Sequence, residues 1–258
     1  RWMVEVGERM IPAAKAIRSE FWSPELQAFV DSTSSYAPTI SEQTNGLALA
    51  TGVCTRAEQQ RLLATVFEGG MELGDNPDVS KCDPAFQYHV LDGLIVAGRA
   101  DLALEFLRRR NCNWLRAGLE TIPEVWCPGF ASEISNVQAT TPEAYLLDRI
   151  LLGFRPLEPG CAKIEIAPLT SALEFATGTV CTPEGPVDIG WTSDDHRVQL
   201  SIDKPTGVQA YVILPDEARL VGVSGDCPRR DENEQGTVYS CVVGAEETSI
   251  VIQGVTAP

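Results

Sequence analysis

The chain has 258 residues, of which 44% are hydrophobic and 22% charged, which is typical of a globular protein with one large or two medium domains. Its formal net charge of −16 argues against nucleic acid or an anionic membrane as a partner, because both would be repelled. No apolar run approaches the roughly 18 residues that a membrane span requires. With two histidines and no CxxC motif, we expect no metal site and no cofactor.

The first six residues (RWMVEV) contain no signal peptide and lie inside a helical pattern without an N-cap, so we expect the chain to be the middle of a longer protein. The eight cysteines are too few for a disulfide scaffold. Pairs Cys161–Cys181 and Cys227–Cys241 are possible disulfides, and buried free thiols are the alternative. The even number fits a secreted protein.

Up to about residue 158 the apolar residues recur at helical spacing. Ser41 and Thr55 are expected to start helices, the latter with Glu58 in a capping box. Asp101 is expected to cap a later helix that ends at Arg108–Arg110, where the helix dipole favours cations. The expected helices cover residues 4–17, 41–52, 55–69, 84–98, 101–110 and 142–152.

These helices form pairs, because short links at Gly52 and Gly98 alternate with long links around residues 75–77 and 121–129. Antiparallel pairs of this kind can close into a toroid of helical hairpins, in which the long loops gather on one face and can form a site. An α-solenoid would show a fixed repeat length, and the sequence has none.

After residues 156–160 the apolar period becomes two, and turn residues separate the runs. Many short alternating strands indicate a β-sandwich. Residues 229–232 are expected to form a solvated turn within it. The expected strands include residues 163–166, 187–189, 198–202, 209–213 and 249–252.

Several segments resemble the α-L-rhamnosidases of glycoside hydrolase family 78. They are residues 21–25, 31–32, 41–45, 83–91, 97–103, 121–126, 151–160, 164–168 and 178–186, and the junction at 151–168 is the sharpest match. The resemblance implies a multidomain α and β fold. Residues 1–158 would be the second half of an (α/α)6-barrel catalytic domain, a partial helical toroid, and residues 159–258 an antiparallel β-sandwich.

The segment Thr121–Trp126 places the carboxylate of Glu124 beside an indole. The resemblance implies that Glu124 is the catalytic base of an inverting hydrolase, activating water while a carboxylic acid serves the leaving oxygen. The family's acid lies in the earlier half of the barrel, and no matching motif is present here. Trp126 is either a platform for a sugar ring or part of the core. Glu120 and Glu133 are expected to be surface charges.

The resemblance also indicates further substrate-binding residues. Gln43 and Asn45 begin a helix whose start can face the cavity. Before the last barrel helix the family usually has a His and a Trp, whereas residues 135–140 here offer Asn136 and Gln138 as hydrogen-bonding groups. This departure leaves room for another deoxy-sugar, or for a weakened or inactive relative of the family.

The sequence therefore predicts a secreted glycosidase that removes terminal α-L-rhamnose or a related deoxy-sugar from glycosides or polysaccharides. One alternative is a sugar-binding or structural fragment without activity. Another is a different (α/α)6 enzyme such as a polysaccharide lyase, although the long loops lack the basic cluster that a lyase needs. Half a barrel would expose an apolar wall, so we expect a companion polypeptide to supply the N-terminal half and the general acid.

Overall fold

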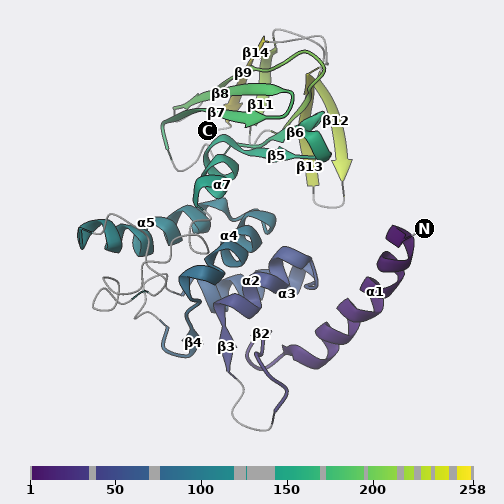
Figure 1. The fold of residues 1–258 in the computed structure, drawn as a ribbon, viewed down its shortest axis with the longest axis vertical. Coiled ribbons are helices and arrows are strands. Elements are labelled where there is room, and N and C mark those ends of the chain that lie inside the picture. Colours follow the sequence, from purple (N-terminus) through teal and green to yellow (C-terminus); the bar gives the residue numbers. More distant parts are fainter. Residues whose placement is uncertain are drawn as a thin grey trace. The chain divides into compact units, whose positions relative to one another are not determined.

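The computed structural model describes residues 2–34, 39–69, 76–118, 126, 143–168, 173–194, 197–213, 218–223, 228–233, 236–243 and 249–256. The chain divides into two compact units, Arg1–Glu143 and Ala144–Pro258 (Figure 1). The first unit is mainly helical and the second mainly strands.

Within its described residues, the helical unit contains four longer helices joined by short strands and turns. In chain order its described elements are α1 (Trp2–Phe21), β1 (Trp22–Ser23), β2 (Ala28–Phe29), β3 (Ile40–Ser41), α2 (Glu42–Thr51), α3 (Arg56–Leu62), η1 (Leu63–Phe67), β4 (Val79–Ser80), η2 (Pro84–Phe86), α4 (Gln87–Val96) and α5 (Ala100–Arg116). None of the helices in the described part of the chain is long and apolar enough to cross a membrane.

The helix starts that the sequence predicted at Ser41 and Thr55 are confirmed. Ser41 is the N-cap of α2, and its hydroxyl accepts a hydrogen bond from the Thr44 N–H. Thr55 and Glu58 form both halves of a capping box on α3. Gly52 ends α2 in the left-handed conformation, at φ 67°, where glycine avoids the cost that a side chain would bring.

The predicted bounds of the fifth helix are wrong. Helix α5 begins at Ala100 with Arg99 in the cap position, and it continues to Arg116. Asp101 lies in the first turn, where it binds the guanidinium of Arg99. The helix passes Arg110 because no glycine or proline interrupts it before Gly118, and because Trp114 continues its buried face.

Helices α2 and α4 pack closely through two glycines. A Cβ atom added at Gly46 would lie 2.7 Å from the Cα atom of Val90, and one added at Gly93 would overlap the carbonyl oxygen of Gly46. The backbones of the two helices therefore meet without intervening side chains. This contact fixes the position of α2, whose first turn contributes to the site described below.

From Glu143 onward the chain forms two helical segments, α7 continued by η3 and the short η4, and ten strands within the described residues. They are α7 (Glu143–Leu147), η3 (Asp148–Leu152), β5 (Phe154–Pro156), η4 (Pro159–Cys161), β6 (Lys163–Ile166), β7 (Phe175–Thr182), β8 (Gly185–Ser193), β9 (Arg197–Asp203), β10 (Gln209–Ile213), β11 (Ala218–Val223), β12 (Pro228–Asn233), β13 (Gly236–Val243) and β14 (Ser249–Thr256).

The strands form two five-stranded sheets, ordered β12-β13-β10-β6-β5 and β11-β14-β9-β8-β7. All the strands predicted from the period of two are confirmed as β6, β8, β9, β10 and β14. The prediction of purely antiparallel pairing is wrong at one place, since β10 pairs with β6 in parallel. Residues 229–232 form most of β12 rather than a turn, because this edge strand pairs with β13 across the link at 234–235.

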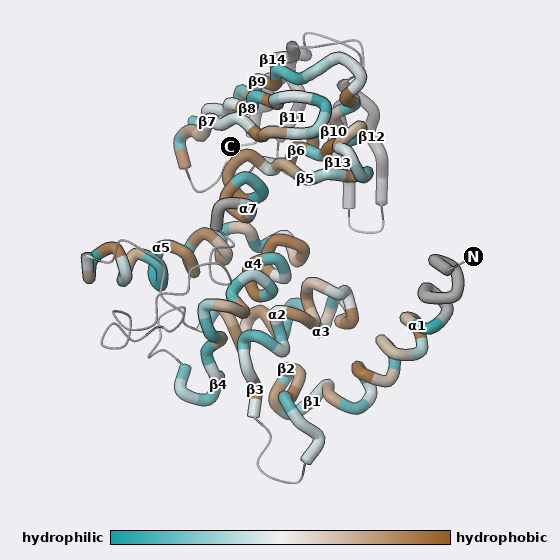
Figure 2. Tube along the Cα trace, in the orientation of Figure 1, coloured by the Kyte–Doolittle hydropathy of each residue, from teal (hydrophilic) through white to brown (hydrophobic). Residues whose placement is uncertain are grey.

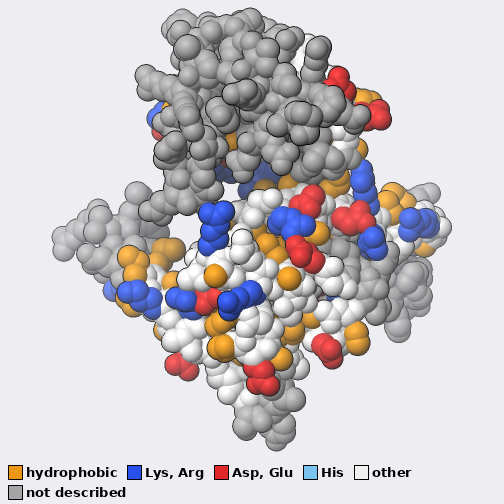
Figure 3. Space-filling model, turned by 180° about the vertical axis from the view of Figure 1, so that it is seen from behind, with side chains coloured by type: hydrophobic (Ala, Val, Ile, Leu, Met, Phe, Trp, Pro, Cys, Tyr) orange, Lys and Arg blue, Asp and Glu red, His pale blue; other side chains and the backbone are white. Residues whose placement is uncertain are grey.

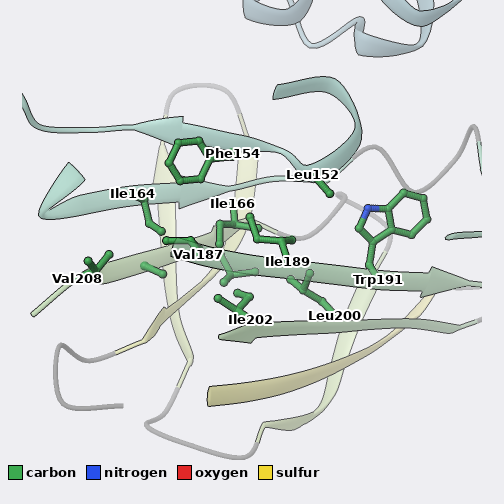
Figure 4. Packing of buried hydrophobic residues seen from close by; sticks show 12 residues of the cluster. Leu152, Phe154, Ile164, Ile166, Val187, Ile189, Trp191, Leu200, Ile202 and Val208 are labelled. Atoms are coloured by element: carbon green, nitrogen blue, oxygen red, sulfur yellow. The ribbon is translucent and has the colours of Figure 1, made fainter. Parts of the chain in front are cut away.

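The two sheets share one hydrophobic core (Figure 4). Strands β6 and β10 of one sheet contribute Ile164, Ile166, Ala210 and Val212, and strands β8 and β9 of the other contribute Val187, Ile189, Trp191, Leu200 and Ile202. The strands bury alternate residues, as a sheet with one covered face requires.

The division of the chain lies earlier than the predicted boundary at residue 158, since residues 144–158 belong with the sheets. Leu152 and Phe154 lie in the core of the sheets, and the Trp191 indole N–H donates to the Leu151 carbonyl at 2.7 Å. Gly153 allows the chain after Leu152 to pass close to Ala167. Its φ is 70°, and a Cβ atom at this position would overlap the backbone of Ala167.

Cys161 and Cys181 are free thiols in the structure, so the disulfide considered between them is absent. Cys227 lies outside the described residues. Cys54, Cys82 and Cys112 are also free, as expected for buried or half-buried thiols.

We expect Gly93→Ala to destabilise the helical unit despite the better helix propensity of alanine, which is worth about 1 kcal/mol. The added methyl group would overlap the backbone of Gly46, and overpacking of this kind costs about 1–3 kcal/mol. Urea unfolding followed by far-UV circular dichroism measures the difference. Gly69→Ala is the control, since its Cβ atom would meet nothing closer than 3.6 Å. Equal stability of the two variants would contradict the close α2–α4 contact.

Candidate functional site

The structure brings residues 28–31, which include Asp31 of the matching segment 31–32, next to the matching segment at residues 41–45. The side chain of Asn45 is fully buried. Its oxygen accepts from the Phe29 N–H at 2.9 Å, and its nitrogen donates to the carbonyls of Phe29 and Ser41 at 3.0 and 2.9 Å. Asn45 thus ties the first turn of α2 to β2.

Asp31 provides a second link between the same segments. One of its carboxylate oxygens accepts hydrogen bonds from the hydroxyls of Ser41, at 2.5 Å, and Thr44, at 2.6 Å. Asp31 itself is exposed. An exposed carboxylate therefore lies beside the N-terminus of α2, with its orientation set by two hydroxyl donors.

The parallel pairing of β3 with β4 places residues 81 and 82 next to Glu42. The Glu42 carboxylate is fully buried and accepts from the Cys82 N–H at 3.1 Å and from Lys81 at 3.2 Å. It also receives both terminal nitrogens of Arg110 on α5, at 2.5 and 2.7 Å. Three segments far apart in the sequence therefore meet at one buried carboxylate.

Arg110 is as deeply buried as Glu42, and this two-point pairing is the strong geometry for a guanidinium and a carboxylate. Burial alone raises the pKa of Glu42, but the hydrogen bonds and charge of Arg110, together with the charge of Lys81, outweigh it and lower that pKa below its ordinary value. A lowered pKa keeps Glu42 ionised at neutral pH, so we assign it a structural role and not that of a proton donor.

Trp126 packs on this charged cluster. Its indole N–H donates to the Cys82 carbonyl, and its ring stacks on Trp114 with centroids 4.8 Å apart and planes 13° from parallel. The Arg110 guanidinium lies 4.0 Å from the ring centroid of Phe106 and 5.6 Å from that of Trp126. A cation over aromatic faces in a desolvated place is a stabilising arrangement.

The remaining predicted site residues divide into two groups. Glu124, Asn136 and Gln138 lie outside the described residues. Gln43 lies in the first turn of α2, half-buried, and the described part of the chain offers its carboxamide no hydrogen-bond partner. Asn45 differs from Gln43, since backbone groups already occupy its carboxamide, and we assign it a structural role.

Sequence reasoning missed Glu42 and Arg110. The signal for Arg110 was present. Arg110 lies three or four residues from Phe106, Leu107 and Trp114, and these residues share with Ala103 one apolar face of α5. A single cation within such an apolar stripe predicts a buried partner.

The described residues contain no group of three or more His, Cys, Asp or Glu side chains placed to hold a metal ion. What they offer is the half-buried indole of Trp126, which packs near Arg110, and, at the start of α2, the exposed carboxylate of Asp31 and the half-buried carboxamide of Gln43. Planar aromatic faces and oriented polar groups of this kind are suited to binding a polar ligand.

Comparison with known proteins agrees with the predicted resemblance. Residues 153–226 match the family described as the bacterial alpha-L-rhamnosidase C-terminal domain. Over 147 residues the chain is 28% identical to an alpha-L-rhamnosidase of Alteromonas sp. (strain LOR), which covers 52% of this chain. The chain is therefore similar to α-L-rhamnosidases over part of its length.

Solved rhamnosidase structures share its fold. The enzyme from Dictyoglumus thermophilum has a TM-score of 0.73 at 18% identity over 97% of this chain, and that from Streptomyces avermitilis, complexed with L-rhamnose, 0.70 at 16% identity over 97%. The GH78 rhamnosidase of Bacillus sp. GL1 has 0.65 at 24% identity over 79%. This chain spans only 16% of the Alteromonas protein and 22–28% of these structures.

We expect Glu42→Gln to destabilise the protein by about 3–5 kcal/mol at neutral pH, because it leaves Arg110 buried without its counter-charge. The pKa of Glu42 is lowered in the folded state, so its contribution is fully present above its unfolded pKa and is lost as the pH falls from about 4.5 through the lowered value. The loss on mutation should therefore shrink over that acidic range. Urea unfolding of both proteins at several pH values measures it.

The control for this experiment is Glu165→Gln, which breaks the partly exposed pair with Arg155 and should change stability by less than about 1 kcal/mol. A stability loss at Glu42 that is independent of pH down to strong acid would contradict a charged, paired Glu42.

Proposed function

We propose that this chain is the C-terminal part of an inverting glycoside hydrolase that removes terminal α-L-rhamnose, or a related deoxy-sugar, from glycosides or polysaccharides. The observation that supports it most directly is the anchoring of Trp126, two residues after Glu124, to Cys82 and Trp114. The segment that resembles the family's catalytic loop is thereby attached at its aromatic residue. The relation to α-L-rhamnosidases supplies the substrate class.

In this proposal Glu124 removes a proton from the water that attacks the anomeric carbon. A carboxylic acid on the opposite side of the sugar protonates the leaving oxygen, and the two carboxyl groups stand roughly 6.5–9.5 Å apart to admit the water. Gln43, Asn136 and Gln138 would donate or accept hydrogen bonds at the sugar hydroxyls. No cofactor takes part.

The same proposal assigns the fold. The helical unit would be the second half of an (α/α)6 barrel, and the two sheets would form a β-sandwich beyond it. The enzyme would be secreted, where its glycoside substrates occur. The replacement of the family's usual His and Trp by residues 135–140 favours a deoxy-sugar whose hydroxyl pattern suits amide groups.

A companion polypeptide would supply the first half of the barrel and the general acid. Helix α1 supports this part of the proposal, because it carries apolar residues (Figure 2) and several of them are exposed. Met10, Ile11 and Ile17 are 64%, 63% and 45% exposed, and Met10, Ala13, Ala14 and Ile17 share one face at helical spacing. The described residues that α1 contacts include Glu58, which pairs with Arg18, but they leave this face uncovered.

If Glu124 is the base, Glu124→Gln should reduce turnover on an aryl α-L-rhamnoside on the order of 10²–10⁴-fold, because glutamine keeps the size of the side chain but cannot accept the proton. Glu120→Gln and Glu133→Gln are the controls and should be nearly silent. The assay uses the enzyme with its N-terminal half present, and initial rates at saturating substrate measure kcat. Full activity of Glu124→Gln with unchanged thermal unfolding would overturn the assignment and leave the non-catalytic fragment as the better hypothesis.

If the uncovered face of α1 packs against the companion, Ile17→Glu should weaken the association of separately produced halves at least tenfold. A buried, unpaired carboxylate costs several kcal/mol. Ser19→Glu is the matched control, since Ser19 lies on the opposite side of the helix. Isothermal titration calorimetry gives both dissociation constants. Equal constants, or a monomeric chain that binds no N-terminal half, would contradict the companion.

A further inference from the structure

We propose that the side of strands β5, β6 and β10 that faces away from the core is a binding surface for an uncharged oligosaccharide, with a sugar ring stacked on the ring of Tyr211. All the residues that form this surface belong to the strand unit and are described by the structure. The inference goes beyond the proposed function, because this second surface holds carbohydrate without cleaving it.

The pairing of the strands places the residues of this surface next to one another. Apolar residues of β6 and β10 fill the core side, so the alternate residues project from the opposite side of the sheet. Glu165 on β6 lies between Arg155 on β5 and Tyr211 on β10. Lys163 on β6 lies opposite Gln209 on β10. Neighbouring strands are about 4.8 Å apart, so these five side chains form one continuous surface.

The ring of Tyr211 leans along its strand. Its hydroxyl donates to the side-chain oxygen of Gln209 at 3.0 Å, and Gln209 lies two residues earlier, a distance of about 6.6 Å along the strand. A ring that stood straight out from the sheet would not reach that oxygen, whereas one that leans along the strand does. Tyr211 is half-buried, as expected when one face of the ring covers the sheet and the other faces outward.

Two ion pairs hold polar groups in place beside this ring. Arg155 donates from Nε and Nη2 to the two carboxylate oxygens of Glu165, at 2.8 and 2.7 Å, a two-point contact with a defined orientation. Lys163 pairs with Glu158 at 2.6 Å. The side chains of Arg155 and Lys163 are 46% and 42% exposed, so a ligand can reach their N–H groups.

The chemistry of this surface suits a sugar. A pyranose has apolar C–H groups on the faces of its ring and hydroxyl groups around its edge. An aromatic ring that lies beside oriented donors and acceptors complements both. In the proposed complex, Glu165 accepts hydrogen bonds from sugar hydroxyls, and Arg155 and Lys163 donate to them.

The charge balance of the surface favours an uncharged ligand over a polyanion or a protein. The two cations are balanced by two carboxylates, while the whole chain carries a charge of −16. A polyanion therefore meets no local attraction that would offset the overall repulsion. Protein interfaces are depleted of charged residues at their centre, whereas Arg155, Glu165 and Lys163 lie in the middle of this surface.

The test measures the binding of hexasaccharides by isothermal titration calorimetry, using the protein with its N-terminal half present. The uncharged probes are hexamers of glucose, mannose and xylose, and a galacturonic acid hexamer is the charged probe. Tyr211→Ala removes the ring, Tyr211→Phe removes only the hydroxyl, and Glu165→Gln removes the carboxylate. Tyr88→Ala is the matched control, because Tyr88 is a partly exposed tyrosine (37%) on α4 in the other unit.

We expect at least one uncharged hexamer to bind and Tyr211→Ala to raise its Kd about tenfold, because the stacking contact is lost. Tyr211→Phe should raise it less, since the ring remains. Glu165→Gln should also raise it, because the amide cannot hold Arg155 in the same two-point contact. Tyr88→Ala should leave it unchanged. Thermal unfolding followed by circular dichroism checks that each variant is folded, and if Tyr211→Ala is not, Tyr211→Phe and Glu165→Gln decide the question.

The proposal is wrong if no uncharged hexamer binds, if the galacturonic acid hexamer binds more tightly, or if the variants of Tyr211 and Glu165 bind as the unchanged protein does. It is also wrong if analytical ultracentrifugation shows self-association that Tyr211→Phe and Glu165→Gln abolish, since the surface would then join copies of the chain. These measurements involve no turnover, so the result with Glu124→Gln does not affect their outcome.

Discussion

The buried pair of Glu42 and Arg110 is the interaction on which the helical unit depends. Each charge would be costly to bury alone, and the pair is tolerable only because the geometry is two-pointed and Lys81 and the Cys82 N–H complete the carboxylate's hydrogen bonds. That requirement links the first turn of α2, the segment after β4 and the middle of α5. The close contact between Gly46 on α2 and Gly93 on α4 then fixes the position of α4.

The regular elements could be predicted from sequence where local chemistry decided them. Ser41 and Thr55 cap helices because their hydroxyls accept from the first turn, and alternating apolar residues define strands such as β9 and β10. The end of α5 could not be placed from a basic tripeptide, because the charge of Arg110 is neutralised by Glu42, 68 residues earlier. A partner so distant in the sequence cannot be identified from neighbouring residues. The local pattern shows only that a cation lies within an apolar stripe.

The segments that form the site could be predicted from the sequence, but the roles of their individual residues were harder to predict. The motif at residues 41–45 was recognised, but its chemistry is divided: Glu42 and Asn45 point into the protein and hold it together, whereas Gln43 is half-buried and has no partner among the described residues. Helical periodicity distinguishes such neighbours only when the surrounding faces are known. The boundary between the two units likewise depends on tertiary packing. Leu152 lies in the core of the sheets, and Gly153 permits the turn that follows it.

The exposed charges of the helical unit contribute differently to stability from the buried pair in its interior. On the face seen in Figure 3, Lys and Arg side chains lie beside Asp and Glu side chains, and Arg99 contacts both Glu68 and Asp101 in this manner. Exposed pairs of this kind contribute little to stability. A well-packed apolar group in place of Glu42 and Arg110 would often be as stable as the ion pair. An apolar group would lack the directed hydrogen bonds that fix Cys82 in orientation. Because the Cys82 carbonyl in turn accepts the Trp126 indole N–H, the charged pair also helps to hold the side chain of Trp126.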